Sequence, residues 1–227
     1  MGKLVLIRHG QSQWNLENRF TGWIDIPLSN QGRKEAKQAG RTVRDILFDW
    51  AFTSKLIRAV ETLLLVLSVN QEQKTPIFVP EGEGEKNWGE HYKPNPLREI
   101  PVYRALALNE RYYGDLQGLN KLDSAQRWGA EQVRLWRRSY EQAPPGGESL
   151  KDTVVRVIPY LKEIILPSLS NNKNLLIVAH GNTLRAIIMM LENMPAEKVA
   201  ELEIPTGSPI IFEAEKISER LSGEGWR

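Results

Sequence analysis

Short apolar runs alternate with longer amphipathic stretches along this chain, which predicts an α/β protein. Residues 4–7 form a continuous apolar run, typical of a strand buried on both faces. Over 29–47, apolar residues recur at helical spacing. A second short strand is expected over 50–54, with a helix over about 56–69 after it. This order of elements favours a three-layer fold with a mostly parallel central sheet flanked by helices.

The half of the chain after about residue 100 continues this alternation. Pro144-Pro145-Gly146-Gly147 separates two expected helices, and Pro159 lies inside the second, where proline is expected to introduce a kink. The elements expected here, in chain order, are helices over about 123–140 and 148–166, a strand over 174–179, a helix over about 182–194 and a strand over 209–212.

Residues 71 to about 99 interrupt this rhythm. They mix glutamine, glycine and proline with charged residues, and we predict an irregular surface insertion within a single domain over residues 1–227. The tip of the insertion contains Trp88, His91 and Tyr92. We interpret it as decoration, an interface or a lid, and the sequence leaves these three alternatives open.

The composition is that of an ordinary globular protein. The 227 residues include 30 Lys+Arg and 28 Asp+Glu, a formal charge of +2 that gives no indication of a nucleic-acid partner. Cysteine is absent, which excludes disulfides, thiolate metal sites and a cysteine nucleophile. Purely apolar runs such as Leu63 to Leu67 are far shorter than the roughly 20 residues of a membrane helix. We therefore expect a cytoplasmic protein without membrane association.

The strongest chemical signal is that two of the three histidines share one context. His9 and His180 each follow an apolar strand and precede a glycine. Ligands of open parallel sheets bind beyond the carboxyl ends of the strands, so neighbouring strands would bring both imidazoles into one crevice. A lone histidine here is more often bonded to a backbone carbonyl, but the pair, with Arg8 beside His9, indicates function.

The residues close to these histidines favour an anion over a metal ion. They include Arg8, Gln11, Ser12, Asn182 and Arg185, whereas a metal centre would need further imidazole or carboxylate ligands. A neutral imidazole can attack phosphorus, and guanidinium groups can hold phosphoryl oxygens through charge-assisted hydrogen bonds. The pattern predicts phosphoryl transfer through a phosphohistidine, with no metal.

Arg58 and Asn182 agree with this prediction. Arg58 lies on the first turn of a helix, where the helix dipole favours anions, and Asn182 opens the helix after His180. Each also has an ordinary interpretation, as a solvated arginine and as a helix cap. Only the nearby histidine pair makes a functional interpretation of Arg58 and Asn182 preferable.

These residues also carry a family resemblance. Leu6-Ile7-Arg8-His9-Gly10-Gln11-Ser12-Gln13-Trp14-Asn15 resembles the phosphohistidine motif of the histidine phosphatase superfamily, in the form found in cofactor-dependent phosphoglycerate mutases. The resemblance covers about residues 3–213, and Asn109–Gly114 is far more specific than Arg-His-Gly. It implies a phosphoglycerate mutase-like fold. Further matching segments are Phe20–Trp23, Pro27–Ser29, Thr53–Ser54, Arg58–Ala59, Asp115–Lys121, Leu135–Arg138, Gly147–Leu150, Ala179–Asn182 and Ile204–Gly207.

The resemblance implies a role for each matching position. His9 would be the phosphorylated nucleophile, and His180, with Arg8 and Arg58, would stabilise the transferring phosphoryl group. Glu110 would be the general acid and base. Desolvation would raise the pKa of its carboxyl group and nearby arginines would lower it, and the sequence leaves this balance open. The implied substrate-binding residues are Gln11, Ser12, Asn15, Thr21, Gly22, Arg111, Tyr112, Tyr113, Lys121, Arg137, Arg138, Gly181 and Asn182.

The implied activity is interconversion of 3-phosphoglycerate and 2-phosphoglycerate in glycolysis and gluconeogenesis, primed by 2,3-bisphosphoglycerate and without a metal. Small phosphoglycerates are the expected partners, and the resemblance leaves a homodimer open. The alternatives are a metal-independent histidine phosphatase acting on a small phosphorylated metabolite, and a catalytically silent sensor of such a ligand. The stretch from Glu110 to Lys121, together with Arg137 and Arg138, favours the mutase.

Two departures from the family pattern bear on this choice. The insertion over 71–99 is longer than the resemblance leads us to expect. The chain is also short before Gly147 and after Phe212, ending at Arg227. A more open pocket would admit water, which would favour hydrolysis of a phosphohistidine over its transfer.

Overall fold

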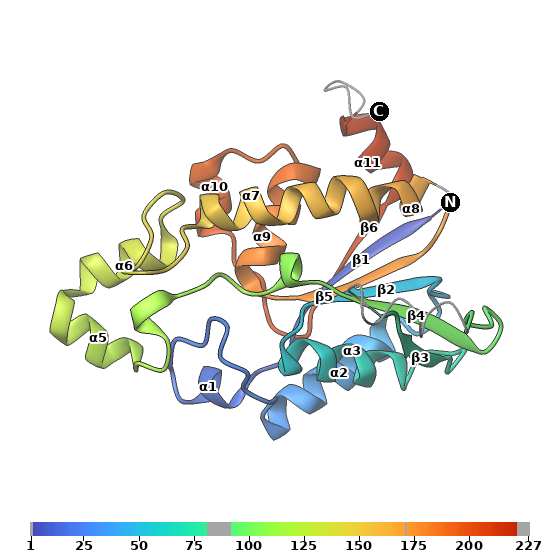
Figure 1. Ribbon diagram of the computed structural model, residues 1–227, viewed down its shortest axis with the longest axis horizontal. Coiled ribbons are helices and arrows are strands. Elements are labelled where there is room, and N and C mark those ends of the chain that lie inside the picture. The colour runs from blue at the N-terminus through green and yellow to red at the C-terminus, as the bar shows by residue number, and fades with distance from the viewer. Residues whose placement is uncertain (1, 81–91, 171, 222–227) are drawn as a thin grey trace.

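The computed structural model describes residues 2–80, 92–170 and 172–221, and its centre is a six-stranded sheet (Figure 1). The strand order is β3-β4-β2-β5-β1-β6, and β6 alone runs antiparallel to its neighbour. The expected mostly parallel α/β fold is confirmed. The strands are β1 (Lys3–Arg8), β2 (Trp50–Thr53), β3 (Thr75–Phe78), β4 (Glu99–Arg104), β5 (Leu175–Ala179) and β6 (Pro209–Glu213).

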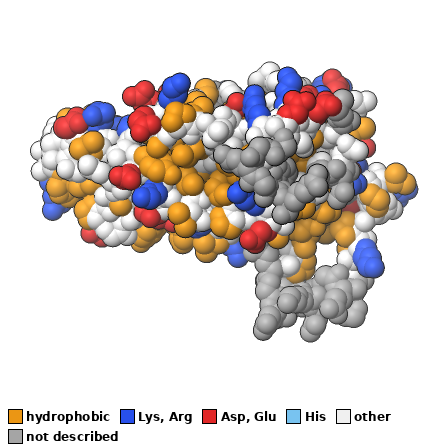
Figure 2. Space-filling view, turned by 90° about the horizontal axis from the view of Figure 1, so that it is seen from above, with side chains coloured by type: hydrophobic (Ala, Val, Ile, Leu, Met, Phe, Trp, Pro, Cys, Tyr) orange, Lys and Arg blue, Asp and Glu red, His pale blue; other side chains and the backbone are white. Residues whose placement is uncertain are grey.

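Helices cover both faces of the sheet (Figure 1). On one face lie α2 (Asn30–Thr42), capped by the Ser29 side chain, and α3 (Ile57–Leu67). On the other lie α7 (Leu150–Tyr160) and α9 (Gly181–Leu191). The face seen in Figure 2 mixes acidic and basic side chains, as the near-balanced charge leads one to expect.

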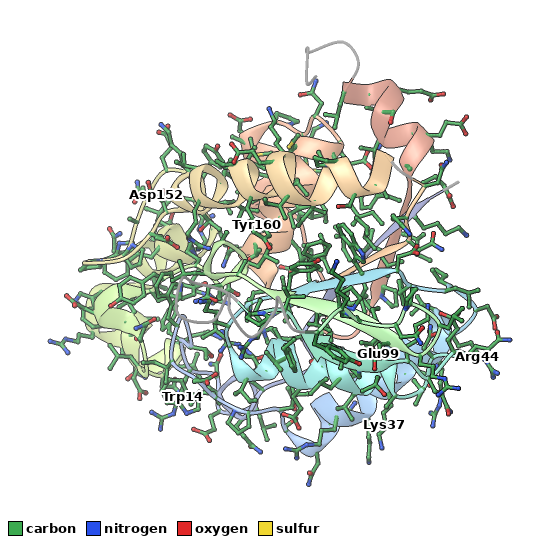
Figure 3. All side chains as sticks on the ribbon, turned by 45° about the vertical axis from the view of Figure 1, so that its right-hand side comes forward. Trp14, Lys37, Arg44, Glu99, Asp152 and Tyr160 are labelled. Atoms are coloured by element: carbon green, nitrogen blue, oxygen red, sulfur yellow. The ribbon has the colours of Figure 1, made fainter. Side chains whose placement is uncertain are left out.

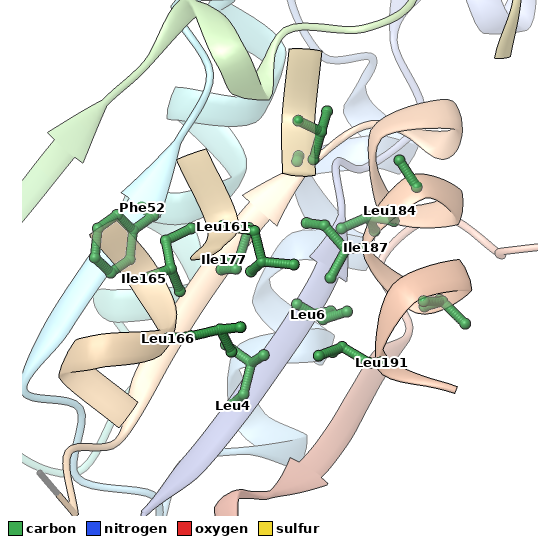
Figure 4. Close-up of a cluster of buried hydrophobic side chains, with 14 of the residues drawn as sticks. Leu4, Leu6, Phe52, Leu161, Ile165, Leu166, Ile177, Leu184, Ile187 and Leu191 are labelled. Atoms are coloured by element: carbon green, nitrogen blue, oxygen red, sulfur yellow. The ribbon is translucent and has the colours of Figure 1, made fainter. Parts of the chain in front are cut away.

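Successive side chains of the central strands point alternately into two separate hydrophobic cores, one on each face of the sheet. In β1, Leu4 and Leu6 point into the core under α7 and α9, and Val5 and Ile7 into the core over α2 and α3. Figure 4 shows the first core, in which Leu4 and Leu6 pack with side chains from β5 and α9. A strand buried on both faces holds its ends rigidly, because shifting it would expose apolar side chains on either side.

The helix expected over about 123–140 is two helices that form a hairpin. They are α5 (Lys121–Trp128) and α6 (Ala130–Arg138), and they meet at Gly129, which has a φ of 87°. That conformation is outside the helical region and suits glycine, so the periodic pattern on either side could not continue as one helix. A small third core, which includes Phe20 and Trp136, packs beneath this hairpin.

The segment predicted to be irregular contains β3, which pairs in parallel with β4 at the edge of the sheet. The prediction was wrong for these residues because Pro76 weakens the sequence signal of a strand, while an edge position tolerates a missing backbone donor. Trp88 and His91 lie outside the described residues, as do residues 222–227. Tyr92 is described, and its hydroxyl group hydrogen-bonds to the Glu99 carboxylate.

The remaining elements are short, and several of them were not predicted. Beyond Pro159, α7 passes into a π-helical turn and then α8, which is the change of helix geometry that a proline near this point favours. Among the described residues, no helix is long and apolar enough to cross a membrane. These elements are α1 (Gln13–Leu16), η1 (Leu106–Leu108), η2 (Gly114–Leu116), η3 (Leu161–Ile165), α8 (Leu166–Ser170), α10 (Ala196–Glu201) and α11 (Ala214–Leu221).

Candidate active site

The two strand-end histidines meet at the carboxyl edge of the sheet. β1 and β5 are parallel neighbours with Arg8 opposite Ala179, so the next residue of each strand is a histidine. The ring centroids of His9 and His180 lie 4.9 Å apart, with the planes inclined at 60°. Both side chains are buried, at 2% and 0% exposure. The structure therefore brings together the pair that the sequence pattern singled out.

The His9 ring is arranged to act as a neutral nucleophile. Its Nδ1 lies 2.7 Å from the Gly10 carbonyl oxygen, which can only accept a hydrogen bond. The proton is thereby fixed on Nδ1, and Nε2 keeps its lone pair. Burial, helped by the positive charges of Arg58 and Arg8, holds the pKa of His9 well below its usual value. The ring is thus neutral near pH 7, with the Nε2 lone pair free to attack an electrophile.

Ser54 orients the second histidine. Its Oγ lies 2.8 Å from His180 Nε2 and also accepts a hydrogen bond from the Leu56 backbone N–H. Burial, together with Arg58, His9 and Arg8, holds the pKa of His180 well below its usual value, so the ring is neutral. If Ser54 donates its proton to Nε2, the ring proton sits on Nδ1. That atom is buried without a partner in the described structure, and it is then a free donor for an anion.

Arg58 is buried at 1% exposure on the first turn of α3. Its two terminal nitrogens donate to the backbone carbonyls of Ile24 (3.0 Å) and Gly22 (2.7 Å). Gly22 has a φ of 54°, and a Cβ there would lie 2.1 Å from the side-chain oxygen of Gln117, so the turn requires glycine. Burial lowers the pKa of Arg58 to about 10, which leaves it positively charged at neutral pH.

Glu110 is buried at 9% exposure and faces the N-terminal end of α9. Its Oε1 accepts hydrogen bonds from the Arg111 backbone N–H at 2.8 Å and from the Asn182 side chain at 3.0 Å. The carboxylate is held by a loop on one side and by the first turn of α9 on the other. Asn182 therefore lies in the first turn of α9 and also hydrogen-bonds to the Glu110 carboxylate. The sequence alone did not distinguish a helix cap from a residue of the site.

His9, Arg58 and Glu110 line a cavity of about 120 Å³ at the carboxyl edge of the sheet, and His180 lies beside it against the His9 ring. We refer to Arg8, His9, Arg58, Glu110 and His180 as the floor, and to Lys121, Arg137, Arg138 and Glu203 as the rim. Burial lowers the pKa of Lys121 at the rim. Thirteen of the sequence-predicted site residues line the cavity: Arg8, His9, Asn15, Thr21, Gly22, Arg58, Glu110, Tyr113, Lys121, Arg137, Arg138, Gly181 and Asn182.

Besides His180, whose ring packs against that of His9, four other predicted residues are not among the described residues that line the cavity. Ser12 caps α1 in a reciprocal pair with Asn15, and Gln11 accepts a hydrogen bond from the Ser29 hydroxyl. Tyr112 stacks edge-on against Trp23, and the fully buried Arg111 donates to the Tyr113 hydroxyl at 3.1 Å. In this structure these four residues contact neighbouring protein groups and do not line the cavity themselves.

The predicted site residues leave out several contributors. Arg19, Phe20, Arg185, Glu203 and Ile204 also line the cavity, and the Ser54 hydroxyl group contacts His180. The sequence had placed Arg185 near the histidines, and it lies one helical turn beyond Asn182 and donates to the Asn182 side-chain oxygen at 3.0 Å. Nothing in the sequence marked Glu203, which reaches the cavity from the loop before β6.

Several buried donors at this site have no partner in the described structure. They are Arg8 Nε, Thr21 Oγ1, Arg138 Nη1 and His180 Nδ1. Buried donors of this kind are costly unless a ligand supplies acceptors. A phosphoryl group is such a ligand, so the residues present fit a phosphorylated molecule. Other basic side chains, such as Lys37 and Arg44, lie on the α2 side of the molecule, away from the α5–α6 hairpin (Figure 3).

A buried, neutral histidine pair at the wall of a cationic cavity is suited to phosphoryl transfer on an α/β scaffold, and comparison with known proteins agrees. The sequence matches the histidine phosphatase superfamily (branch 1) over residues 4–98 and 95–224. The structure is similar to the α-ribazole phosphatase from Shigella flexneri, with a TM-score of 0.70 and 27% identity, covering 92% of this chain and 89% of that one.

Curated relatives are closer in sequence. The chain is 50% identical over 212 residues to the 2,3-bisphosphoglycerate-dependent phosphoglycerate mutase of Chlamydia caviae, covering 93% of each chain. It is 51% identical over 215 residues to the enzyme of the same name from Methanococcus vannielii, covering 93% of this chain and 90% of that one. The chain therefore belongs to the histidine phosphatase superfamily and, within it, to the family of 2,3-bisphosphoglycerate-dependent phosphoglycerate mutases.

Proposed function

We propose that this protein interconverts 3-phosphoglycerate and 2-phosphoglycerate, in glycolysis and gluconeogenesis, through a phosphohistidine on His9. The observation that carries the proposal is the buried neutral His9 in one cavity with the buried Glu110 carboxylate and a surplus of cations. Two relatives of about half-identical sequence and nearly equal extent, whose names state this activity, support it.

His9 and Glu110 divide the chemistry between them. His9 Nε2 attacks phosphorus with its lone pair while the bond from phosphorus to the glycerate oxygen breaks, and Glu110 protonates that oxygen. In the return step Glu110 removes the proton from the attacking hydroxyl group, and the phosphorus–nitrogen bond breaks. 2,3-Bisphosphoglycerate supplies the phosphoryl group that primes His9. We propose Arg8, Arg58 and His180 as donors to the phosphoryl oxygens, where charge builds up during transfer.

The rim binds the other end of the ligand in this proposal. A phosphoglycerate carries a carboxylate as well as a phosphate, and Lys121, Arg137 and Arg138 lie on the hairpin that closes one side of the cavity. Fixed cations there would orient the glycerate so that either hydroxyl oxygen can face His9. Asn15, Thr21, Gly22 and Asn182 complete the proposed binding set at the cavity wall.

The proposal includes a cytoplasmic location, small phosphoglycerates as the partners and no required metal ion. An assay in EDTA with 3-phosphoglycerate and catalytic 2,3-bisphosphoglycerate, followed by phosphorus NMR, tests the activity and the metal independence together. Rapid formation of 2-phosphoglycerate with little free phosphate is the expected result. Release of phosphate without isomerisation would show a phosphatase, and the mutase proposal would then be wrong.

A further inference from the structure

Two carboxylates line the cavity among the described residues, and only one of them has a part in the chemistry proposed above. Glu110 lies on the floor. Glu203 lies at the rim, where its side chain is 69% exposed and forms an ion pair with Arg138 Nη2. A carboxylate inside a site for anions repels the ligand, so its position there needs a physical explanation.

The backbone on both sides of Glu203 is fixed by arginines of the same cavity. Arg185 Nε donates to the Leu202 carbonyl oxygen at 2.8 Å, and Arg8 Nη1 donates to the Ile204 carbonyl oxygen at 2.7 Å. Ile204 is itself buried at 2% exposure. The loop therefore holds Glu203 opposite Arg138, and both arginines that fix it belong to the ligand cavity.

Arg138 is only half engaged in this arrangement. Its Nη2 pairs with Glu203, while its Nη1 is buried without a partner in the described structure. A planar guanidinium binds an anionic group best when both nitrogens donate to it. An anionic ligand group that reaches Arg138 must therefore compete with the Glu203 carboxylate. An exposed ion pair is weak, so this competition costs the ligand only about a twofold to fivefold loss of affinity.

We propose that Glu203 is an internal competitor for the second anionic group of the ligand. It pairs with Arg138 while the cavity is empty, yields Arg138 to the ligand, and pairs with it again as the product leaves. The residue thereby weakens the hold on ligands with two anionic groups and leaves ligands with a single anionic group, bound at the floor, unaffected. The inference rests on the proposed function for the identity of the ligand.

The test compares wild type with Glu203→Gln and with Glu201→Gln, which removes an exposed carboxylate of α10 outside the cavity. Glu203→Gln is expected to lower KM for 3-phosphoglycerate about twofold to fivefold. The dissociation constant of inorganic phosphate for the unphosphorylated protein, in which the floor is free, should stay the same, and Glu201→Gln should change neither value. An equal change in both variants would reveal a general charge effect and overturn the proposal.

A double-mutant cycle tests whether Glu203 acts through Arg138. In an Arg138→Gln background, Glu203→Gln should no longer change KM, and a change that persists would overturn the proposal. Dissociation constants for 2,3-bisphosphoglycerate, measured by calorimetry in a His9→Ala background, should show the same pattern without turnover. Wild-type isomerisation reports on the proposed function, and the ratios between variants report on Glu203. If wild type neither isomerises 3-phosphoglycerate nor binds 2,3-bisphosphoglycerate, the proposed function fails and this inference fails with it.

Discussion

His9 and His180 lie at the ends of strands buried on both faces, whereas Lys121 and Arg138 lie on a two-helix hairpin attached beside the sheet. The floor residues are held by the main core, by backbone carbonyls and by Ser54. Arg138 at the rim keeps 31% of its side chain exposed and pairs with the exposed side chain of Glu203. This difference matches the proposed division of function, in which bond-making groups lie on the rigid core and groups that bind and release the rest of the ligand lie on a separate hairpin.

Among the floor and rim variants, His9→Ala is expected to have the largest effect on catalysis. We expect kcat to fall at least about 10⁴-fold, because the variant removes the nucleophile and not only a contact. Isomerisation measured in a coupled assay checks this, with the melting temperature as the control for folding. Turnover within tenfold of wild type would remove His9 from the mechanism.

Glu110→Gln should have the next largest effect. The amide keeps the shape of the side chain but cannot exchange a proton, so we expect kcat to fall about 10²- to 10⁴-fold. Phosphorylation of the protein by 2,3-bisphosphoglycerate should remain detectable, because the nucleophile is intact. Single-turnover kinetics separates the two steps, and unchanged transfer to the hydroxyl group would exclude Glu110 as the acid and base.

Lys121→Met tests the rim. Because the methionine side chain retains the bulk and loses the charge, we expect KM for 3-phosphoglycerate to rise about tenfold to 100-fold with a smaller change in kcat. Steady-state kinetics checks this split. A fall in kcat with constant KM would contradict the division between floor and rim.

Ser54→Ala tests the support of the floor. Loss of the hydrogen bond leaves His180 free to take the other tautomer, and we expect kcat to fall about tenfold with KM nearly constant. Ser54→Thr, which restores a hydroxyl group, should recover most of the activity. If Ser54→Ala is as active as wild type, the hydrogen bond has no part in catalysis.

The smallest effect concerns stability and pH. His9 and His180 have folded-state pKa values well below their usual value, because burial disfavours their charged form. Below about pH 6.5 the unfolded chain binds protons at these positions and the folded chain does not, so stability is lost as pH falls. Each histidine contributes up to about 1.4 kcal/mol per pH unit in that window. Urea unfolding of wild type and His9→Ala between pH 7 and 5 should show a shallower loss in the variant.

The two histidines of the site could be predicted from the sequence because their physical cause is local, whereas Glu110 followed only from the family resemblance. An apolar run ending in His-Gly predicts a buried strand and a strand-end side chain, and the sheet then fixes where both histidines lie. The basic residues of the rim followed only from the family resemblance, since Arg137 and Arg138 by themselves resemble a solvated helix face. Gly129 lies between the two helices of the hairpin, and the hydrophobic periodicity of the sequence does not reveal its backbone conformation.

Other features depend on contacts between distant segments and could not be predicted. Ser54 meets His180 only because β2 and β5 are neighbours, and Glu203 meets Arg138 across 65 positions of sequence. The edge strand β3 was missed because Pro76 weakens its pattern. Pairing partners of this kind are properties of the folded chain, and a single sequence does not display them.

The most direct measurement is to map the phosphoryl group on the protein itself. Wild type is mixed with ³²P-labelled 2,3-bisphosphoglycerate, quenched in alkali and digested, and the labelled peptide is identified by mass spectrometry. The account predicts one acid-labile phosphoryl group on His9, transferable to 3-phosphoglycerate and absent from His9→Ala. An acid-stable label on a serine or threonine, or a label retained in His9→Ala, would contradict it.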